Sequence, residues 1–106
     1  MHMEESVIKE AVNRILQVSR PVRIILFGSA AAEKMTADSD LDFLVIEDEF
    51  INEREESIRL RSSLGDLGLP VDIFAMTRNR FEETKGVIGG LAYPAHKYGR
   101  TVYEVS

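Results

Sequence analysis

The chain of 106 residues contains no cysteine and has no long apolar run. Without cysteine, disulfide bonds and thiolate metal sites are excluded, which fits a reducing cytoplasm. No apolar stretch approaches the roughly 20 residues that span a bilayer. The acidic, polar start MHMEESVIKEAV lacks the pattern of a signal peptide. The sequence therefore predicts a cytoplasmic protein that has no membrane partner.

The chain also lacks an excess of basic residues. It has 13 Lys and Arg against 18 Asp and Glu, which gives a formal net charge of −5. Binding to a nucleic-acid backbone needs clustered Lys and Arg, so a nucleic-acid template is not expected as a partner. An acidic protein that handles a polyphosphate would need Mg²⁺ to bridge the like charges. The length and the 44% hydrophobic content predict a single globular domain over residues 1–106.

The spacing of apolar residues predicts alternating helices and strands. An amphipathic stripe of apolar residues predicts a helix over 4–19. The acidic run Glu47-Asp48-Glu49 is expected to be a solvated connection. Short connections between the elements favour one compact layered structure of helices and sheet. Strands are expected at 22–27, 41–46, 71–76 and 100–105, and helices from 52 or 53 to about 67, from 77 to about 85 and over 91–98, with a further short helix possible at 30–34.

The stretch IILFGSAAAEKMTADSDLDFLVI, residues 24–46, organises the chain. Asp40 and Asp42 would project from the same face of a strand, about 7 Å apart at Cα. Two carboxylates on one face suit a hard cation such as Mg²⁺. Gly28 lets the backbone approach a ligand closely, and a short helix opening at Ser29 would present N–H groups to an anion. A phosphate site beside a metal site indicates phosphoryl or nucleotidyl transfer.

Each carboxylate also has a structural explanation. Asp40 and Asp42 could cap a turn and a strand edge, although Asp42 would then be a buried charge unless it were exposed or ligated. Asp72, in the apolar strand VDIFAM, could pair with an arginine or lie on an exposed sheet face. If its strand lies beside that of Asp42, Asp72 would instead add a third metal ligand or a general base.

These residues resemble a known family. The stretch LFGSAAAEKMTADSDLDFLV is similar to the signature of the nucleotidyltransferase superfamily with the DNA polymerase β-like fold: Gly-Ser, a loop of about ten residues, then Asp-x-Asp. The strand PVDIFAMT and the ending AHKYGRTVYE resemble the minimal nucleotidyltransferases in particular. The resemblance implies an α+β fold with a small mixed sheet, like a polymerase β palm, and helices packed mainly on one face.

The resemblance also implies a reaction and its residues. Gly28 and Ser29 would hold the β- and γ-phosphates of a nucleoside triphosphate. Asp40 and Asp42 would bind two Mg²⁺ ions, and Asp72 would match the third carboxylate of the family. The implied reaction is transfer of a nucleoside monophosphate, most often AMP from ATP, to a hydroxyl, with pyrophosphate leaving.

One departure from the family bears on phosphate binding. The family commonly reads Gly-Ser-x-Ala-Arg-Gly, whereas this chain has Ala32 and Glu33 at the last two positions. An arginine there could help to neutralise a triphosphate, and its absence weakens the case for efficient catalysis. Lys34, from the same loop, is the candidate substitute.

The resemblance further implies a partner. Minimal members are often encoded beside a small helical HEPN-type protein and act as the antitoxin of that pair, in some cases by adenylylating a tyrosine of the toxin. The alternative is a non-catalytic antitoxin that neutralises such a partner by contact alone. A domain of this size leaves the nucleotide site open on one side, so a partner protein or a second copy is expected to complete it.

Overall fold

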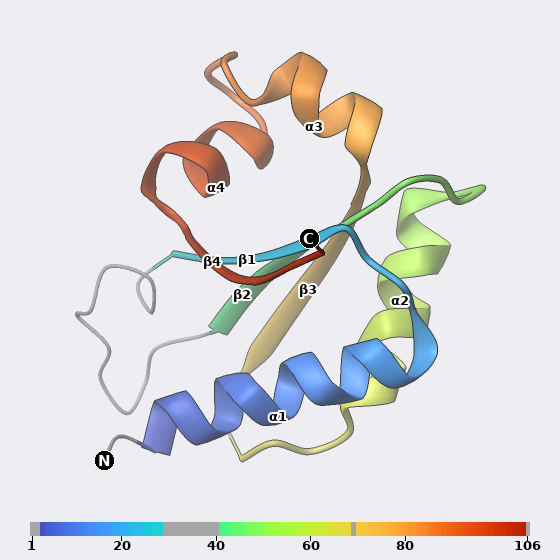
Figure 1. Ribbon diagram of the computed structural model, residues 1–106, viewed down its shortest axis with the longest axis vertical. Coiled ribbons are helices and arrows are strands. Elements are labelled where there is room, and N and C mark those ends of the chain that lie inside the picture. The colour runs from blue at the N-terminus through green and yellow to red at the C-terminus, as the bar shows by residue number, and fades with distance from the viewer. Residues whose placement is uncertain (1–2, 29–40, 69, 106) are drawn as a thin grey trace.

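The computed structural model describes residues 3–28, 41–68 and 70–105. Its elements follow the predicted order closely (Figure 1). Their bounds are α1 Met3–Val18, β1 Arg23–Phe27, β2 Leu41–Glu47, α2 Glu53–Leu64, β3 Val71–Thr77, α3 Arg78–Thr84, α4 Ala92–Tyr98 and β4 Arg100–Glu104. The short helix predicted at 30–34 lies outside the described residues.

The strands form one mixed sheet in the order β3-β2-β1-β4. Strand β1 pairs antiparallel with both β2 and β4, whereas β2 and β3 run parallel. The parallel pair is possible because α2 crosses over between β2 and β3, as parallel connections require. The predicted α+β class and the mixed sheet are therefore confirmed.

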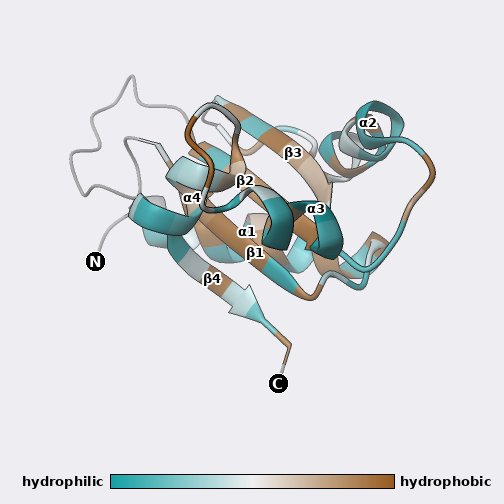
Figure 2. Ribbon diagram, turned by 90° about the horizontal axis from the view of Figure 1, so that it is seen from above, coloured by the Kyte–Doolittle hydropathy of each residue, from teal (hydrophilic) through white to brown (hydrophobic). Residues whose placement is uncertain are grey.

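The helices cover both faces of the sheet, so the prediction that they pack mainly on one face is wrong. In Figure 1, α3 and α4 lie above the sheet and α1 lies below it. In Figure 2, which is seen from above, α3 and α4 lie in front of the strands. The reason lies in α3 and α4 themselves, where Phe81, Ala92 and Ala95 are apolar and buried. They pack on Ile25 and Ile46, which would otherwise expose an apolar surface to water.

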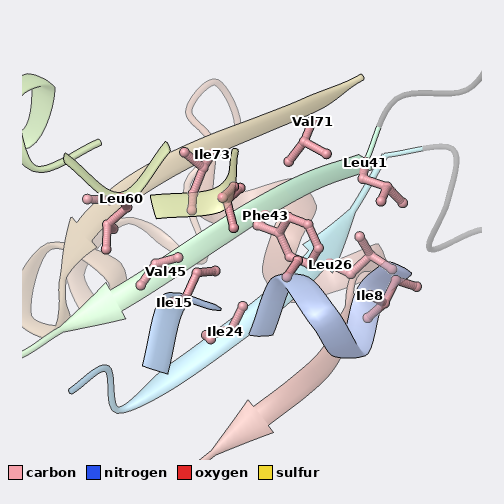
Figure 3. Close-up of a cluster of buried hydrophobic side chains, with 13 residues drawn as sticks. Ile8, Ile15, Ile24, Leu26, Leu41, Phe43, Val45, Leu60, Val71 and Ile73 are labelled. Atoms are coloured by element: carbon pink, nitrogen blue, oxygen red, sulfur yellow. The ribbon is translucent and has the colours of Figure 1, made fainter. Parts of the chain in front are cut away.

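The main core lies on the opposite face, between the sheet and helices α1 and α2. Ile8 and Ile15 of α1 point toward β1 and β2, where Leu26 and Phe43 are fully buried (Figure 3). Burial of each such side chain stabilises the fold by about 1.5–3 kcal/mol. The i, i+4 apolar stripe of α1 is thus explained by its packing on alternate residues of two strands.

Helix α2 also closes the open edge of the sheet at β3. The Ser57 hydroxyl accepts a hydrogen bond of 2.9 Å from the Ala75 backbone N–H, and Arg61 donates to the Val71 carbonyl. These bonds satisfy strand groups that would otherwise face solvent as an unpaired edge. The helix ends at Leu64, earlier than predicted, because Gly65 takes a positive φ of 61° that stops it.

The acidic run after β2 is only partly solvated. Asp48 and Glu49 are exposed, as predicted, but Glu47 is the last residue of β2 and its exposed fraction is 7%. The Ser19 hydroxyl donates a hydrogen bond to its Oε2. The prediction of a solvated connection is therefore wrong at Glu47, because β2 extends one residue further than its apolar run.

Among the helices of the described residues, none has the length and the apolar character needed to cross a membrane.

Candidate active site

The parallel pairing of β2 with β3 brings two of the predicted carboxylates together. Asp42 and Asp72 are direct partners across the two strands, which lie about 4.8 Å apart in such a pair. Asp42 shares a sheet face with Leu44, and Asp72 shares one with Met76, both of which pack beneath α3 and α4. The two carboxylates therefore project from the same face. The strand of Asp72 lies beside that of Asp42, which is the arrangement that a shared metal site requires.

The backbone of Gly28 lies against one of these carboxylates, that of Asp42. Its φ is +80°, a backbone conformation that residues with a side chain rarely adopt. A Cβ added there would overlap Asp42 Oδ2. The preceding residue, Phe27, is the direct partner of Asp42 in the antiparallel pair. Any other residue here would strain the backbone and displace the Asp42 carboxylate, which lies against the backbone where β1 ends.

Asp72 combines the two structural alternatives set out from the sequence. Its side chain is 53% exposed, and its Oδ1 lies 3.9 Å from Arg61 Nη1. An exposed ion pair of this kind contributes about 0–1 kcal/mol. That is too little to prevent Asp72 from binding a cation. Sequence reasoning missed Arg61, since α2 carries three arginines at positions 54, 59 and 61 and nothing in the pattern separates them.

The other predicted site residues lie outside the described residues. These are Asp40, which precedes Leu41; Ser29, which follows Gly28; and Lys34, together with the departure at Ala32 and Glu33. Within residues 3–28, 41–68 and 70–105, no three His, Cys, Asp or Glu side chains gather as a metal site. The described part of the candidate site is thus Gly28, Asp42 and Asp72.

The donors present fit a hard divalent cation. Asp42 and Asp72 offer carboxylate oxygens from neighbouring strands, the ligand type that Mg²⁺ prefers while it keeps several waters or substrate phosphates. Two anionic side chains directly opposite each other on a sheet destabilise it by mutual repulsion. A cation between them would remove that repulsion, so the pair has the chemistry of a metal site.

Comparison with known families identifies the class of protein. A family described as nucleotidyltransferase domain matches residues 6–96 of the chain. The match spans α1 to α4 and includes Gly28, Asp42 and Asp72. The chain belongs to this family of the polymerase β-like superfamily. A comparison with curated protein sequences finds no match.

Replacing Gly28 by alanine should disrupt the site. The new Cβ would collide with Asp42 and would also hold a strained positive φ. Such a residue costs about 1 kcal/mol or more in stability, and the displaced carboxylate should reduce nucleotide binding in addition. Thermal unfolding and titration with Mg²⁺ and ATP measure the two effects.

Gly68 provides the matched control for this substitution. Its φ of +83° imposes the same backbone strain, but, apart from its chain neighbours, no described residue has an atom within 4 Å of an added Cβ. We expect Gly68→Ala to lower stability while leaving nucleotide binding unchanged. Equal loss of binding in both variants would show that Gly28 has no special relation to Asp42.

Proposed function

We propose that this protein is an Mg²⁺-dependent nucleotidyltransferase that transfers a nucleoside monophosphate, AMP from ATP, to a hydroxyl of a partner protein. The observation that carries the proposal is the alignment of Asp42 with Asp72 across β2 and β3, with the Gly28 backbone against Asp42. Family membership supports the reaction class.

In this proposal, different residues of the chain bind the metal ions and the phosphates. Asp42 and Asp72 would hold the metal ions, together with Asp40 from the same Asp-x-Asp motif. Gly28 and Ser29 would receive the β- and γ-phosphates, and Lys34 would add a positive charge. The bound metals would activate the attacking hydroxyl and stabilise the charge that develops on the leaving pyrophosphate.

The acceptor in this proposal is a small helical HEPN-type partner, with the protein acting as the antitoxin of a toxin–antitoxin pair in the cytoplasm. Support comes from the resemblance to minimal nucleotidyltransferases in the strand PVDIFAMT and the ending AHKYGRTVYE. The absence of cysteine agrees with that compartment. Assembly with the partner, or with a second copy, would complete a nucleotide site that a small domain leaves open.

A second candidate function is neutralisation of the same partner by contact alone. The observation that favours it is Ala32-Glu33, which places an acidic residue where the family commonly has Arg-Gly. An acidic side chain beside a triphosphate would oppose its binding. Under this alternative, the carboxylates would be dispensable for neutralisation.

Transfer of label from ATP that carries a tagged α-phosphate separates the two functions. Wild type and an Asp40→Asn/Asp42→Asn variant would be incubated with Mg²⁺ in lysate of the source cells. We expect a labelled protein band with wild type alone, and mass spectrometry of that band identifies the acceptor. Absence of label, with partner binding by both forms, would establish the contact mechanism instead.

A further inference from the structure

An aromatic pair lies on the same sheet face as the two carboxylates. Phe74 is two residues beyond Asp72 on β3, so their side chains share a face about 7 Å apart along the strand. Phe27, at the end of β1, is the direct partner of Asp42. The rings of Phe27 and Phe74 are 6.2 Å apart between centroids with an interplanar angle of 47°. They therefore approach each other across β2, beside both carboxylates.

The two rings differ in how far they are covered. Phe27 is buried, with 8% exposed, whereas Phe74 is half-buried and packs at the margin of the cluster beneath α3 and α4. That cluster includes Leu44 and Met76, the residues that follow Asp42 and Phe74 on the same face. Phe74 thus marks the boundary between the part of the face that the helices cover and the part that carries the carboxylates.

We infer that Phe74, supported by Phe27, is the surface on which the base of the bound nucleotide stacks. The inference rests on the proposed nucleotidyl transfer. A nucleotide whose phosphates lie at Gly28 and at a metal ion on Asp42 carries a planar base joined to them through the ribose, and Phe74 offers that base an aromatic ring on the same face. A partly exposed ring backed by a second ring offers a rigid apolar surface, and stacking on aromatic side chains is a common mode of base recognition.

The chemistry of this surface also predicts its selectivity. Every nucleobase has a π-face, so stacking alone does not distinguish one base from another. A ligand that has phosphates and no base, such as inorganic tripolyphosphate, would make the metal contacts without touching Phe74. Loss of the aromatic ring should therefore weaken the binding of nucleotides in general and leave the binding of tripolyphosphate unchanged.

Titration calorimetry with Mg²⁺ and two ligands tests the inference. The ligands are α,β-methylene ATP, which cannot transfer its nucleotide, and inorganic tripolyphosphate. We expect Phe74→Leu to lower the affinity for the ATP analogue about tenfold and to change the affinity for tripolyphosphate by less than about twofold. The same titration repeated with α,β-methylene GTP as a further ligand should show a similar loss of affinity. Phe74→Tyr, which keeps the ring plane, should bind the ATP analogue as wild type does.

Phe50→Leu is the matched control, because Phe50 is also half-buried but packs against the opposite core. It should change neither affinity. Equal binding of the ATP analogue by wild type and Phe74→Leu would overturn the inference, as would an equal loss for both ligands, which would make Phe74 a support of the metal site. Failure of wild type to bind either ligand would refute the proposed function, and the inference with it.

Discussion

Asp42→Asn is expected to reduce the rate of nucleotidyl transfer by at least about 100-fold, which is the loss typical when one group that stabilises transition-state charge is removed. The asparagine has nearly the same shape as the aspartate, so its packing against Gly28 is retained. It lacks the negative charge that would hold a divalent cation opposite Asp72. Initial rates with ATP, Mg²⁺ and the identified acceptor measure the loss.

The same substitution should leave the fold intact. Asparagine is nearly isosteric with aspartate and can still accept hydrogen bonds, so the unfolding temperature of Asp42→Asn without metal should be close to that of wild type. Asp48→Asn, which changes an exposed aspartate of the loop after β2, is the control and should retain activity. Wild-type rates in Asp42→Asn would refute the role assigned to this carboxylate.

Glu47→Gln should remove much of the pH dependence of stability between pH 5 and 8. The pKa of Glu47 is raised to about 7, chiefly by burial and also by a hydrogen bond to Glu56, while the Ser19 hydroxyl opposes the shift. Oε1 of Glu47 accepts no hydrogen bond within the described residues. When protonated, the Glu47 carboxyl can donate a hydrogen bond to Glu56, whose own pKa is lowered, mainly by Arg59.

The sign of the effect follows from proton counting. Between the pKa of an unfolded glutamate, about 4.3, and the native value of about 7, the folded protein binds more protons than the unfolded chain. The free energy of unfolding therefore falls as pH rises through this range, by up to about 3 kcal/mol from this group. The lowered pKa of Glu56 acts in the opposite sense, since its contribution is lost as pH falls below the unfolded value.

Urea unfolding at pH 5, 6, 7 and 8 measures this prediction. Glutamine can accept from Ser19 and donate to Glu56, as the protonated glutamate does, so Glu47→Gln should be more stable than wild type at pH 8 and similar to it at pH 5. Glu49→Gln, an exposed position two residues along the chain, should follow the wild-type profile. A Glu47→Gln profile parallel to that of wild type would show that Glu47 is ionised in the folded protein throughout.

Local patterns in the sequence predicted most of the fold. The apolar spacing of α1 and the β-branched runs of the strands are one-dimensional signals, and Thr77 and Gly99 mark helix ends directly. Thr77 caps α3 by accepting from the Arg80 N–H at 3.2 Å. The placement of α3 and α4 on the second face was not predictable in this way, because Ala92 and Ala95 are small and their burial depends on Ile25 and Ile46 of distant strands.

The candidate site was predictable to a similar degree. Asp42 and Asp72 were conspicuous as charges at the start of apolar strands, and only their pairing needed the parallel register. Arg61 and Glu47 gave no such signal. The position of Arg61 beside Asp72 arises from the packing of α2 on the sheet edge, and the burial of Glu47 arises from the chain around Ser19 folding over the end of β2.

The central claim is that Asp42 and Asp72 bind a divalent cation beside the nucleotide. Its most direct test is a crystal structure of the protein grown with Mn²⁺ and α,β-methylene ATP, with the metal located by its anomalous scattering. The account predicts Mn²⁺ within about 2.0–2.5 Å of an Asp42 carboxylate oxygen, in contact with phosphate oxygens and beside Asp72. Nucleotide bound with no metal at Asp42, or metal bound at another part of the molecule, would contradict it.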